Sequence, residues 1–163
     1  MSRLDSFIRR MQAQRLCLNH AAGLIRDLEG PVLELGLGNG RTYDHLRELL
    51  PDREIYVFDR RMKAHPSCIP SADRLFLGEV ADTLPQAARR LGAAAALVHT
   101  DLGTGQAEGD GALAGQVGPL IDAVLRPGGV VVANHELSVP GWRPLPLPEG
   151  VKPGRYYLYE KAA

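Results

Sequence analysis

The stretch Val32-Leu33-Glu34-Leu35-Gly36-Leu37-Gly38-Asn39-Gly40 decides the fold of this chain, because an apolar run typical of a buried strand leads directly into a glycine-rich turn. Glycine has no Cβ atom and tolerates positive φ, so the three glycines let a ligand approach the main chain. A helical pattern follows from Thr42 onward. A strand, a glycine turn and a helix in this order predict a nucleotide-type ligand at the end of a sheet strand.

The spacing of this turn argues against a dinucleotide. The glycines follow G-x-G-x-G, and Arg41 stands where a dinucleotide-binding G-x-G-x-x-G has its third glycine. Glu34 adds a carboxylate two residues before the first glycine, which suits a cationic ligand better than a diphosphate. An NAD-dependent oxidoreductase is therefore disfavoured, and the chain also lacks a recognisable catalytic Tyr/Lys or Ser/Tyr set.

Short apolar runs alternate with helical stretches along the chain. The runs expected as strands are Val32 to Leu35, Ile55 to Phe58, Leu75 to Leu77, Ala95 to His99 and Val130 to Ala133. Helices are expected from Leu4 to Leu28, Thr42 to Leu50, Ala81 to Leu91 and Ala112 to Leu125, with a short or irregular piece from Met62 to Ala72. Such alternation predicts parallel strands joined by crossover helices.

The last third of the chain follows a different pattern. Prolines between Pro140 and Pro153 exclude a helix there, and the aromatic run from Arg155 to Tyr159 favours a strand in an antiparallel pair. Pro127-Gly128-Gly129 is expected to make a tight reversal, and the segment from Gly103 to Gly111 a loop. The predicted fold is α/β and doubly wound, with a mostly parallel seven-stranded sheet, helices on both faces and a C-terminal antiparallel pair.

The composition predicts a single domain over residues 1–163, with a leading helical segment at 1–29 and a Rossmann-like core at 30–163. The 163 residues are 45% hydrophobic, and nineteen basic residues balance nineteen acidic ones. This neutral balance favours neither nucleic acid nor a membrane as a partner. The absence of an apolar span or a signal-peptide pattern predicts a cytoplasmic location. Two distant cysteines support neither a disulfide framework nor a zinc site.

From about Gly30 to Lys161 the chain resembles the class I, Rossmann-like, S-adenosylmethionine-dependent methyltransferases. The family's first motif matches Glu34 to Gly40, and its acidic residue after the second strand, which holds the ribose hydroxyls, matches Asp59 in "IYVFDR". Its adenine-contacting Gly-Asp or Gly-Glu after the third strand matches Gly78-Glu79. The resemblance implies S-adenosylmethionine as cofactor. The residues expected to bind it are Glu34, Gly36, Gly38, Asn39, Gly40, Asp59, Glu79, Val80 and Asp101.

The resemblance also places the acceptor side. The sequence "LVHTDLG" matches the end of the family's fourth strand, where Asp101 would face the transferred methyl group. His99 lies two residues earlier and is a second catalytic candidate, although a strand-end histidine is more often a hydrogen-bonded scaffold residue. Further acceptor-side candidates are Asn134, His135, Glu136 and Trp142. Methyl transfer is an in-line displacement that discharges the sulfonium, so the protein orients the reactants and removes a proton where the acceptor requires it.

The reaction is expected to need no metal. Metal-assisted O-methyltransferases of this superfamily carry carboxylates and an asparagine after strands four and five; Asp101 and Asn134 match, but Ala133 stands where a second carboxylate is common. The expected acceptor is a small molecule, since the chain has no accessory domain, and a homo-oligomer could complete the pocket. A catalytically silent S-adenosylmethionine-binding module is the alternative. A nucleic-acid methyltransferase is disfavoured by the neutral charge.

Overall fold

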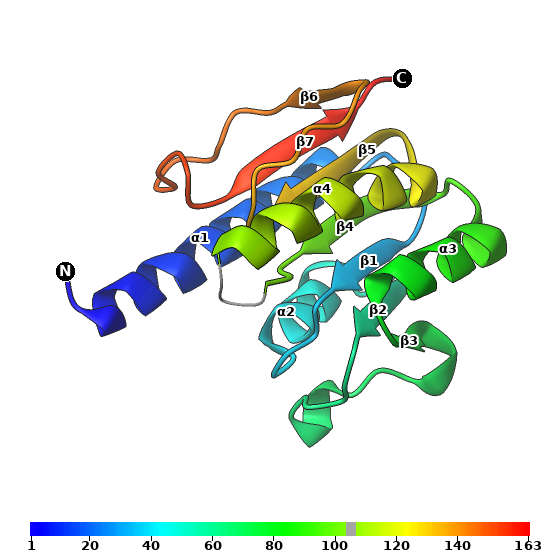
Figure 1. The fold of residues 1–163 in the computed structure, drawn as a ribbon, viewed down its shortest axis with the longest axis horizontal. Helices are drawn as coiled ribbons and strands as arrows, with labels where there is room; N and C mark the ends of the chain where they lie inside the picture. Colours follow the sequence, from blue (N-terminus) through cyan, green and yellow to red (C-terminus); the bar gives the residue numbers. More distant parts are fainter. Residues whose placement is uncertain (104–106) are drawn as a thin grey trace.

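A computed structural model describes residues 1–103 and 107–163 of the chain, which form a sheet between two layers of helices (Figure 1). The strands are β1 Val32–Leu35, β2 Ile55–Asp59, β3 Leu75–Leu77, β4 Ala95–Thr100, β5 Leu125–Ala133, β6 Trp142–Pro144 and β7 Tyr157–Lys161. In the described part of the chain they form one seven-stranded sheet in the order β3-β2-β1-β4-β5-β7-β6. β1 to β5 pair in parallel, and β7 runs antiparallel to β5 and β6. The predicted doubly wound fold with its C-terminal antiparallel pair is confirmed.

The helices divide between the two faces of the sheet. α1 Arg3–Leu24 and α2 Arg41–Leu49 pack on one face, and α3 Val80–Leu91 and α4 Ala107–Val124 pack on the other. Alternate residues of a strand point to opposite faces. In β5, Val132 joins the core with α1 and α2, and Val131 joins the core with α3 and α4. The predicted irregular piece after β2 consists of two short 3₁₀ turns, Pro66–Cys68 and Ala72–Arg74.

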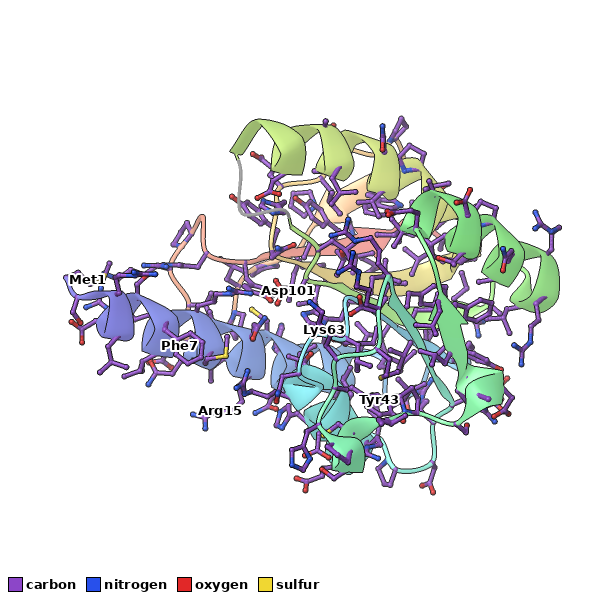
Figure 2. All side chains as sticks on the ribbon, turned by 60° about the horizontal axis from the view of Figure 1, so that its bottom comes forward. Met1, Phe7, Arg15, Tyr43, Lys63 and Asp101 are labelled. Carbon is purple, nitrogen blue, oxygen red and sulfur yellow. The ribbon has the colours of Figure 1, made fainter. Side chains whose placement is uncertain are left out.

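Helix α1 begins at a capping box. Ser2 Oγ accepts a hydrogen bond from the backbone nitrogen of Asp5 at 3.0 Å, and the Asp5 carboxylate accepts one from the backbone nitrogen of Ser2 at 3.0 Å. The helix ends at Leu24 and not at the expected Leu28. The N-terminal end of the chain, with Met1 and Phe7, projects past the body of the domain (Figure 2). The first turns of α1 therefore form a projecting end.

Two segments predicted as a loop and a reversal belong to a helix and a strand. α4 begins at Ala107, so the expected loop from Gly103 to Gly111 is wrong for residues 107–111, and residues 104–106 lie outside the described part. Glycine's low helix propensity is a weak constraint when the following turns, with Val117 and Ile121, pack on the sheet. The expected reversal at Pro127-Gly128-Gly129 lies inside β5, where Ala95 pairs with Leu125 but Leu97 pairs with Val130. These residues form a bulge, and Gly128 has φ +78°.

Candidate functional site

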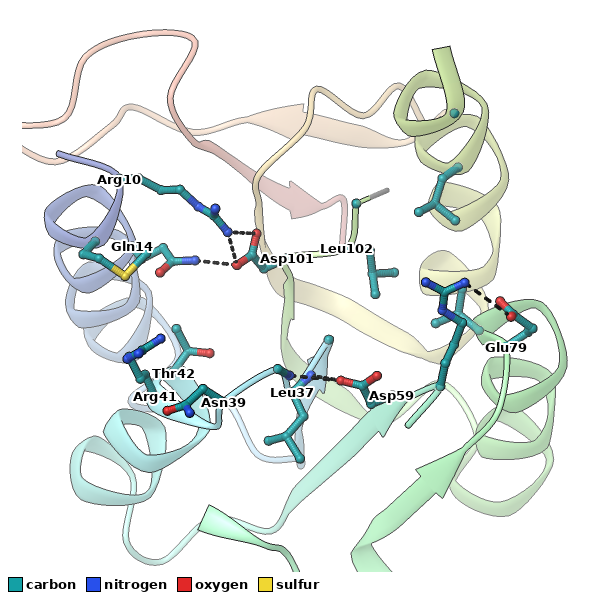
Figure 3. Close-up of a pocket in the computed structure, with 18 of the residues that line it drawn as sticks. Arg10, Gln14, Leu37, Asn39, Arg41, Thr42, Asp59, Glu79, Asp101 and Leu102 are labelled. Carbon is teal, nitrogen blue, oxygen red and sulfur yellow. Dashed lines mark hydrogen bonds and ion pairs between the residues drawn. The ribbon is translucent and has the colours of Figure 1, made fainter. Parts of the chain in front are cut away.

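A cavity of about 590 Å³ opens at the carboxyl ends of β1, β2 and β4, between α1 and the start of α4 (Figure 3). Open α/β sheets bind their ligands at this edge, where the strand order reverses. In this sheet the reversal lies between β1 and β4, which pair with each other. The volume lies within the range of small-molecule and cofactor sites.

The three glycines of the turn after β1 have positive φ but different surroundings. A Cβ atom on Gly36 would lie 2.8 Å from the carbonyl oxygen of Asp101, and one on Gly40 would lie 2.4 Å from Cys68 Cβ. A Cβ atom on Gly38 would meet nothing within 4 Å. Gly36 and Gly40 are thus required for close packing of the chain. Gly38 leaves its main chain open to the cavity.

Asp59 ends β2 beside this turn. Its Oδ2 accepts hydrogen bonds from the backbone nitrogens of Leu37 at 2.9 Å and Gly38 at 3.0 Å, and its Oδ1 accepts one from the nitrogen of Arg61 at 3.2 Å. The carboxylate therefore holds the glycine turn and lines the cavity (Figure 3). The sequence predicts a ligand role for Asp59 but not its bond to the turn, which depends on the pairing of β1 with β2.

Most of the expected cofactor residues lie together on the cavity wall. Those that line it are Gly36, Gly38, Asn39, Asp59, Glu79, Val80 and Asp101. Glu79 lies at the far end, 3.7 Å from the guanidinium of Arg60. Glu34 and Gly40 do not line the cavity. For Gly40 the physical reason is that the position of a Cβ atom faces Cys68 in the interior and not the cavity.

Glu34 and His99 lie beneath the cavity and are completely buried. Glu34 Oε1 accepts a hydrogen bond from Thr42 Oγ1 at 2.5 Å, and its Oε2 pairs with His99 Nδ1 at 2.8 Å. The other ring nitrogen of His99 lies 3.3 Å from the hydroxyl of Tyr156. The prediction that His99 could act as a base in contact with an acceptor is therefore wrong, because both nitrogens are engaged in the interior. The scaffold alternative fits these contacts.

The pKa of His99 reflects these neighbours. Burial lowers it, but the negative charge of Glu34, the hydrogen bond to Glu34 and the charge of Asp101 raise it, and the net result is a pKa above the usual value. An imidazolium would donate to both oxygen atoms, and a neutral ring would donate to Glu34 and accept from the hydroxyl of Tyr156.

Asp101 follows β4 and is held by helix α1. Arg10 Nη2 donates to Asp101 Oδ2 at 2.9 Å and to Oδ1 at 3.2 Å, and Gln14 Nε2 donates to Oδ2 at 2.7 Å (Figure 3). The Asp101 side chain keeps 16% of its surface exposed, on the cavity wall. Phe7 and Met11 of α1 line the same side.

This contribution of α1 is not predicted from the sequence. Its arginines have the spacing of the solvated face of an amphipathic helix, and nothing local shows that the helix crosses the end of β4. One signal was present. Gln14 interrupts a buried face that also holds Ala13, Cys17 and Leu18, and a buried amide in such a position needs polar partners.

The other acceptor-side candidates lie off this cavity. Asn134 donates to the carbonyl oxygen of Leu102 at 3.0 Å, Trp142 donates to Asp122 at 2.8 Å, and His135 lies 3.8 Å from Asp110. None of these three, nor Glu136, lines the cavity. The side of the cavity away from the glycine turn is instead bounded by α1, Leu102 and residues of α4.

Within residues 1–103 and 107–163, no group of three or more His, Cys, Asp or Glu side chains is arranged to hold a metal ion. Within the same residues, no helix has the length and apolar character needed to cross a membrane.

Comparison with known proteins identifies the family. A family model described as S-adenosyl-L-methionine methyltransferase matches residues 1–161. The crystal structure of an S-adenosyl-L-methionine methyl transferase from Silicibacter pomeroyi DSS-3 is 46% identical in sequence, covers 99% of both chains and superposes with a TM-score of 0.95. No curated protein matches the chain.

More distant structures share the fold. Apo CalS11, a TDP-rhamnose 3'-O-methyltransferase of calicheamicin biosynthesis, is 20% identical, with a TM-score of 0.62 over 97% of this chain and 83% of that one. Human methyltransferase-like protein 13, in complex with S-adenosylhomocysteine, is 15% identical, with a TM-score of 0.57 over 95% of this chain and 82% of that one.

The cavity offers groups of both charges to S-adenosylmethionine. The cofactor carries a sulfonium, an ammonium and a carboxylate. The residues that line the cavity include three carboxylates, Asp59, Glu79 and Asp101, and three guanidiniums, Arg10, Arg41 and Arg60, so their formal charges balance. Gly38 leaves room for the ligand beside the main chain. The chemistry of the site agrees with a family match over nearly the whole length: the chain belongs to the S-adenosyl-L-methionine methyltransferases and uses S-adenosylmethionine as its methyl donor.

Proposed function

We propose that this protein transfers a methyl group from S-adenosylmethionine, bound in the cavity beside the glycine turn, to a small molecule that enters between α1 and α4. The observation that carries the proposal is the position of Asp101. Its main chain lies against Gly36 of the turn, and its side chain lies against α1. Asp101 thus joins the half of the cavity that suits the cofactor to the half that remains for an acceptor.

The cofactor half supplies the binding contacts. Asp59 would hold the ribose, and the main chain from Gly36 to Asn39 would lie along the ligand, with Glu79 and Val80 at the adenine end. When bound, the cofactor supplies an electrophilic methyl group on a positively charged sulfur. The turn is already fixed by its hydrogen bonds to Asp59, so little ordering is required of it on binding.

The acceptor half is partly apolar. Phe7 and Met11 of α1, Leu102 after β4 and Leu113 of α4 line it, and these side chains would exclude water and hold the nucleophile in line with the methyl group. Asp101 would accept a proton from an acceptor that carries one. Arg10 and Gln14 keep its carboxylate at the junction.

A small acceptor fits the size and charge of the molecule. Cofactor and acceptor must share a cavity of about 590 Å³. The net charge of zero offers no field for a nucleic acid. A direct test incubates the protein and [methyl-³H]S-adenosylmethionine with a cell extract and separates small molecules from macromolecules by filtration. We expect label in the small-molecule fraction, in addition to that of the cofactor, and less of it with Asp101→Asn.

Other distributions of label would favour other functions. Label in protein or nucleic acid would contradict a small acceptor. Tight binding of S-adenosylhomocysteine without transfer to any fraction would favour the silent binding module.

A homo-oligomer is the second part of the proposal. Leu4, Phe7 and Ile8 on the projecting end of α1 are 66%, 48% and 44% exposed, beside the open side of the cavity. Packing this surface against a second copy would bury the apolar side chains and cover that side. Light scattering after gel filtration should give a multiple of the chain mass of 17.7 kDa, and a monomer would contradict this part.

A further inference from the structure

A chain of hydrogen-bonded side chains runs beneath the cavity on the α1 face of the sheet. Thr42 at one end and Gln14 and Asp101 at the other line the cavity, whereas Glu34, His99 and Tyr156 do not. In order, the members of this buried chain are Thr42, Glu34, His99, Tyr156, Gln14 and Asp101. The contacts to Glu34 and His99 measure 2.5, 2.8 and 3.3 Å, and the last link, from Gln14 to Asp101, measures 2.7 Å.

The buried chain is costly to build and is fully connected. Glu34 and His99 are 0% exposed, Tyr156 is 1% and Gln14 is 4%. Polar groups at such depth destabilise a fold unless every group has a partner, and an apolar core of the same shape would avoid that risk. Its members come from β1, β4, α1, α2, the residue after β4 and the residue before β7. Its cost suggests a role beyond packing.

The amide nitrogen of Gln14 links Tyr156 to Asp101. An imidazolium at His99 donates from Nδ1 to Glu34 and from Nε2 to the oxygen of Tyr156. Burial is the largest influence on Tyr156 and raises the pKa of its hydroxyl, so this group keeps its proton. The hydrogen bond with Gln14 lowers that pKa, so the Gln14 amide is the donor and the Tyr156 oxygen the acceptor. Gln14 Nε2, which carries two N–H groups, also donates to Asp101.

We propose that His99 and Tyr156 are positioning residues, which act through Gln14 to fix the carboxylate of Asp101 in the cavity. Arg10 fixes the same carboxylate from the solvent side, with 52% of its own side chain exposed. An exposed arginine alone holds a carboxylate loosely. The buried links supply the constraint from the interior. This inference rests on the proposed function, in which Asp101 lies at the junction of cofactor and acceptor.

The ring nitrogens of His99 provide a direct readout, because His99 is buried and does not contact the cavity. We propose to record its ¹⁵N signals by NMR in wild type, Asp101→Asn, Tyr156→Phe and the double variant. Asp101→Asn should shift the Nε2 signal, and the shift should fall by about half or more in the Tyr156→Phe background, since the link is then broken. No shift, or an equal shift in both backgrounds, would overturn the inference.

Two further variants serve as a control and as a second way to break the link. Tyr159→Phe is the matched control, because Tyr159 is also buried at 7% and its hydroxyl accepts from the backbone nitrogen of Leu137 at 2.9 Å, on the other face of the sheet. It should leave the response of His99 to Asp101→Asn intact. If Tyr156→Phe does not fold, Gln14→Leu breaks the same link from α1 and should have the same effect. A full response in that variant would overturn the inference.

Ligand addition separates this inference from the proposed function. S-adenosylhomocysteine should shift the His99 signals in wild type and less in Tyr156→Phe. Failure of this compound to bind in a calorimetric titration would count against the proposed site, while the Asp101→Asn experiment would still decide the buried chain. Binding with an equal response of His99 in both proteins would contradict the positioning role.

Discussion

Asp59 at the end of β2 accepts hydrogen bonds from the backbone nitrogens of Leu37 and Gly38, so one carboxylate both holds the glycine turn and faces the cavity. A hydrogen bond to a charged group contributes about 1.5–3 kcal/mol. Asp59→Ala should therefore weaken binding of S-adenosylhomocysteine by about 1.5–3 kcal/mol in calorimetry. Asp59→Asn keeps an oxygen acceptor and should lose less. Unchanged affinity in a folded Asp59→Ala protein would show that another group holds the ribose.

Gly38 and Gly40 should respond differently to the same substitution. Gly40→Ala places a Cβ atom 2.4 Å from Cys68 Cβ at φ +94°, so we expect a stability loss of about 2 kcal/mol or more. Gly38→Ala meets open space at φ +52° and should cost about 1 kcal/mol of stability, with a larger effect on cofactor affinity. Urea unfolding and calorimetry measure the two effects. The reverse order of stability losses would contradict the assignment of Gly40 to packing.

Asp101→Asn should separate binding from chemistry. The asparagine keeps the shape and loses the negative charge, so it cannot accept a proton as a carboxylate does. We expect an affinity for S-adenosylhomocysteine close to that of wild type and a lower kcat with any acceptor found by methyl labelling. Unchanged kcat would move the acceptor site away from Asp101. Arg10→Gln is the companion variant, since it leaves the carboxylate in place and removes only the exposed partner.

The buried pair of Glu34 and His99 should make stability depend on pH. The pKa of His99 is raised on folding, so its contribution to the free energy of unfolding is fully present below the usual value of 6.5 and is lost as pH rises through the folded value. His99→Gln lacks this contribution. The difference in unfolding free energy between wild type and His99→Gln should therefore be largest in mild acid and shrink towards alkaline pH. A difference that grows with pH would show that His99 is buried neutral.

The sequence predicted the elements of the fold well where local pattern and packing agree. The run from Val32 to Gly40 predicts β1, its glycine turn and the position of the site at the sheet edge. The helical start of α4 was missed because glycines at 109 and 111 suggest a loop, whereas packing of later turns on the sheet extends the helix. The bulge in β5 was missed because its existence depends on the register with β4.

The site likewise contains residues whose positions follow from the sequence and residues whose positions depend on tertiary packing. Asp59 is the last residue of β2, Glu79 follows β3 and Asp101 follows β4. Their positions at one edge of the sheet therefore follow from the topology. Arg10 and Gln14 lie some ninety residues before Asp101 in the sequence, and only the tertiary packing of α1 brings them to it. Glu34 and His99 were predicted to face the ligand. Their pairing across β1 and β4 directs both side chains into the interior instead.

A calorimetric titration decides whether the cavity between Asp59 and Asp101 holds S-adenosylmethionine. S-adenosylhomocysteine and NAD are each titrated into wild type and Asp59→Ala. We predict saturable binding of S-adenosylhomocysteine by wild type, weaker binding by Asp59→Ala and no comparable binding of NAD, because Arg41 replaces the third dinucleotide glycine. Equal or tighter binding of NAD, or binding of S-adenosylhomocysteine that is insensitive to Asp59→Ala, would contradict this account.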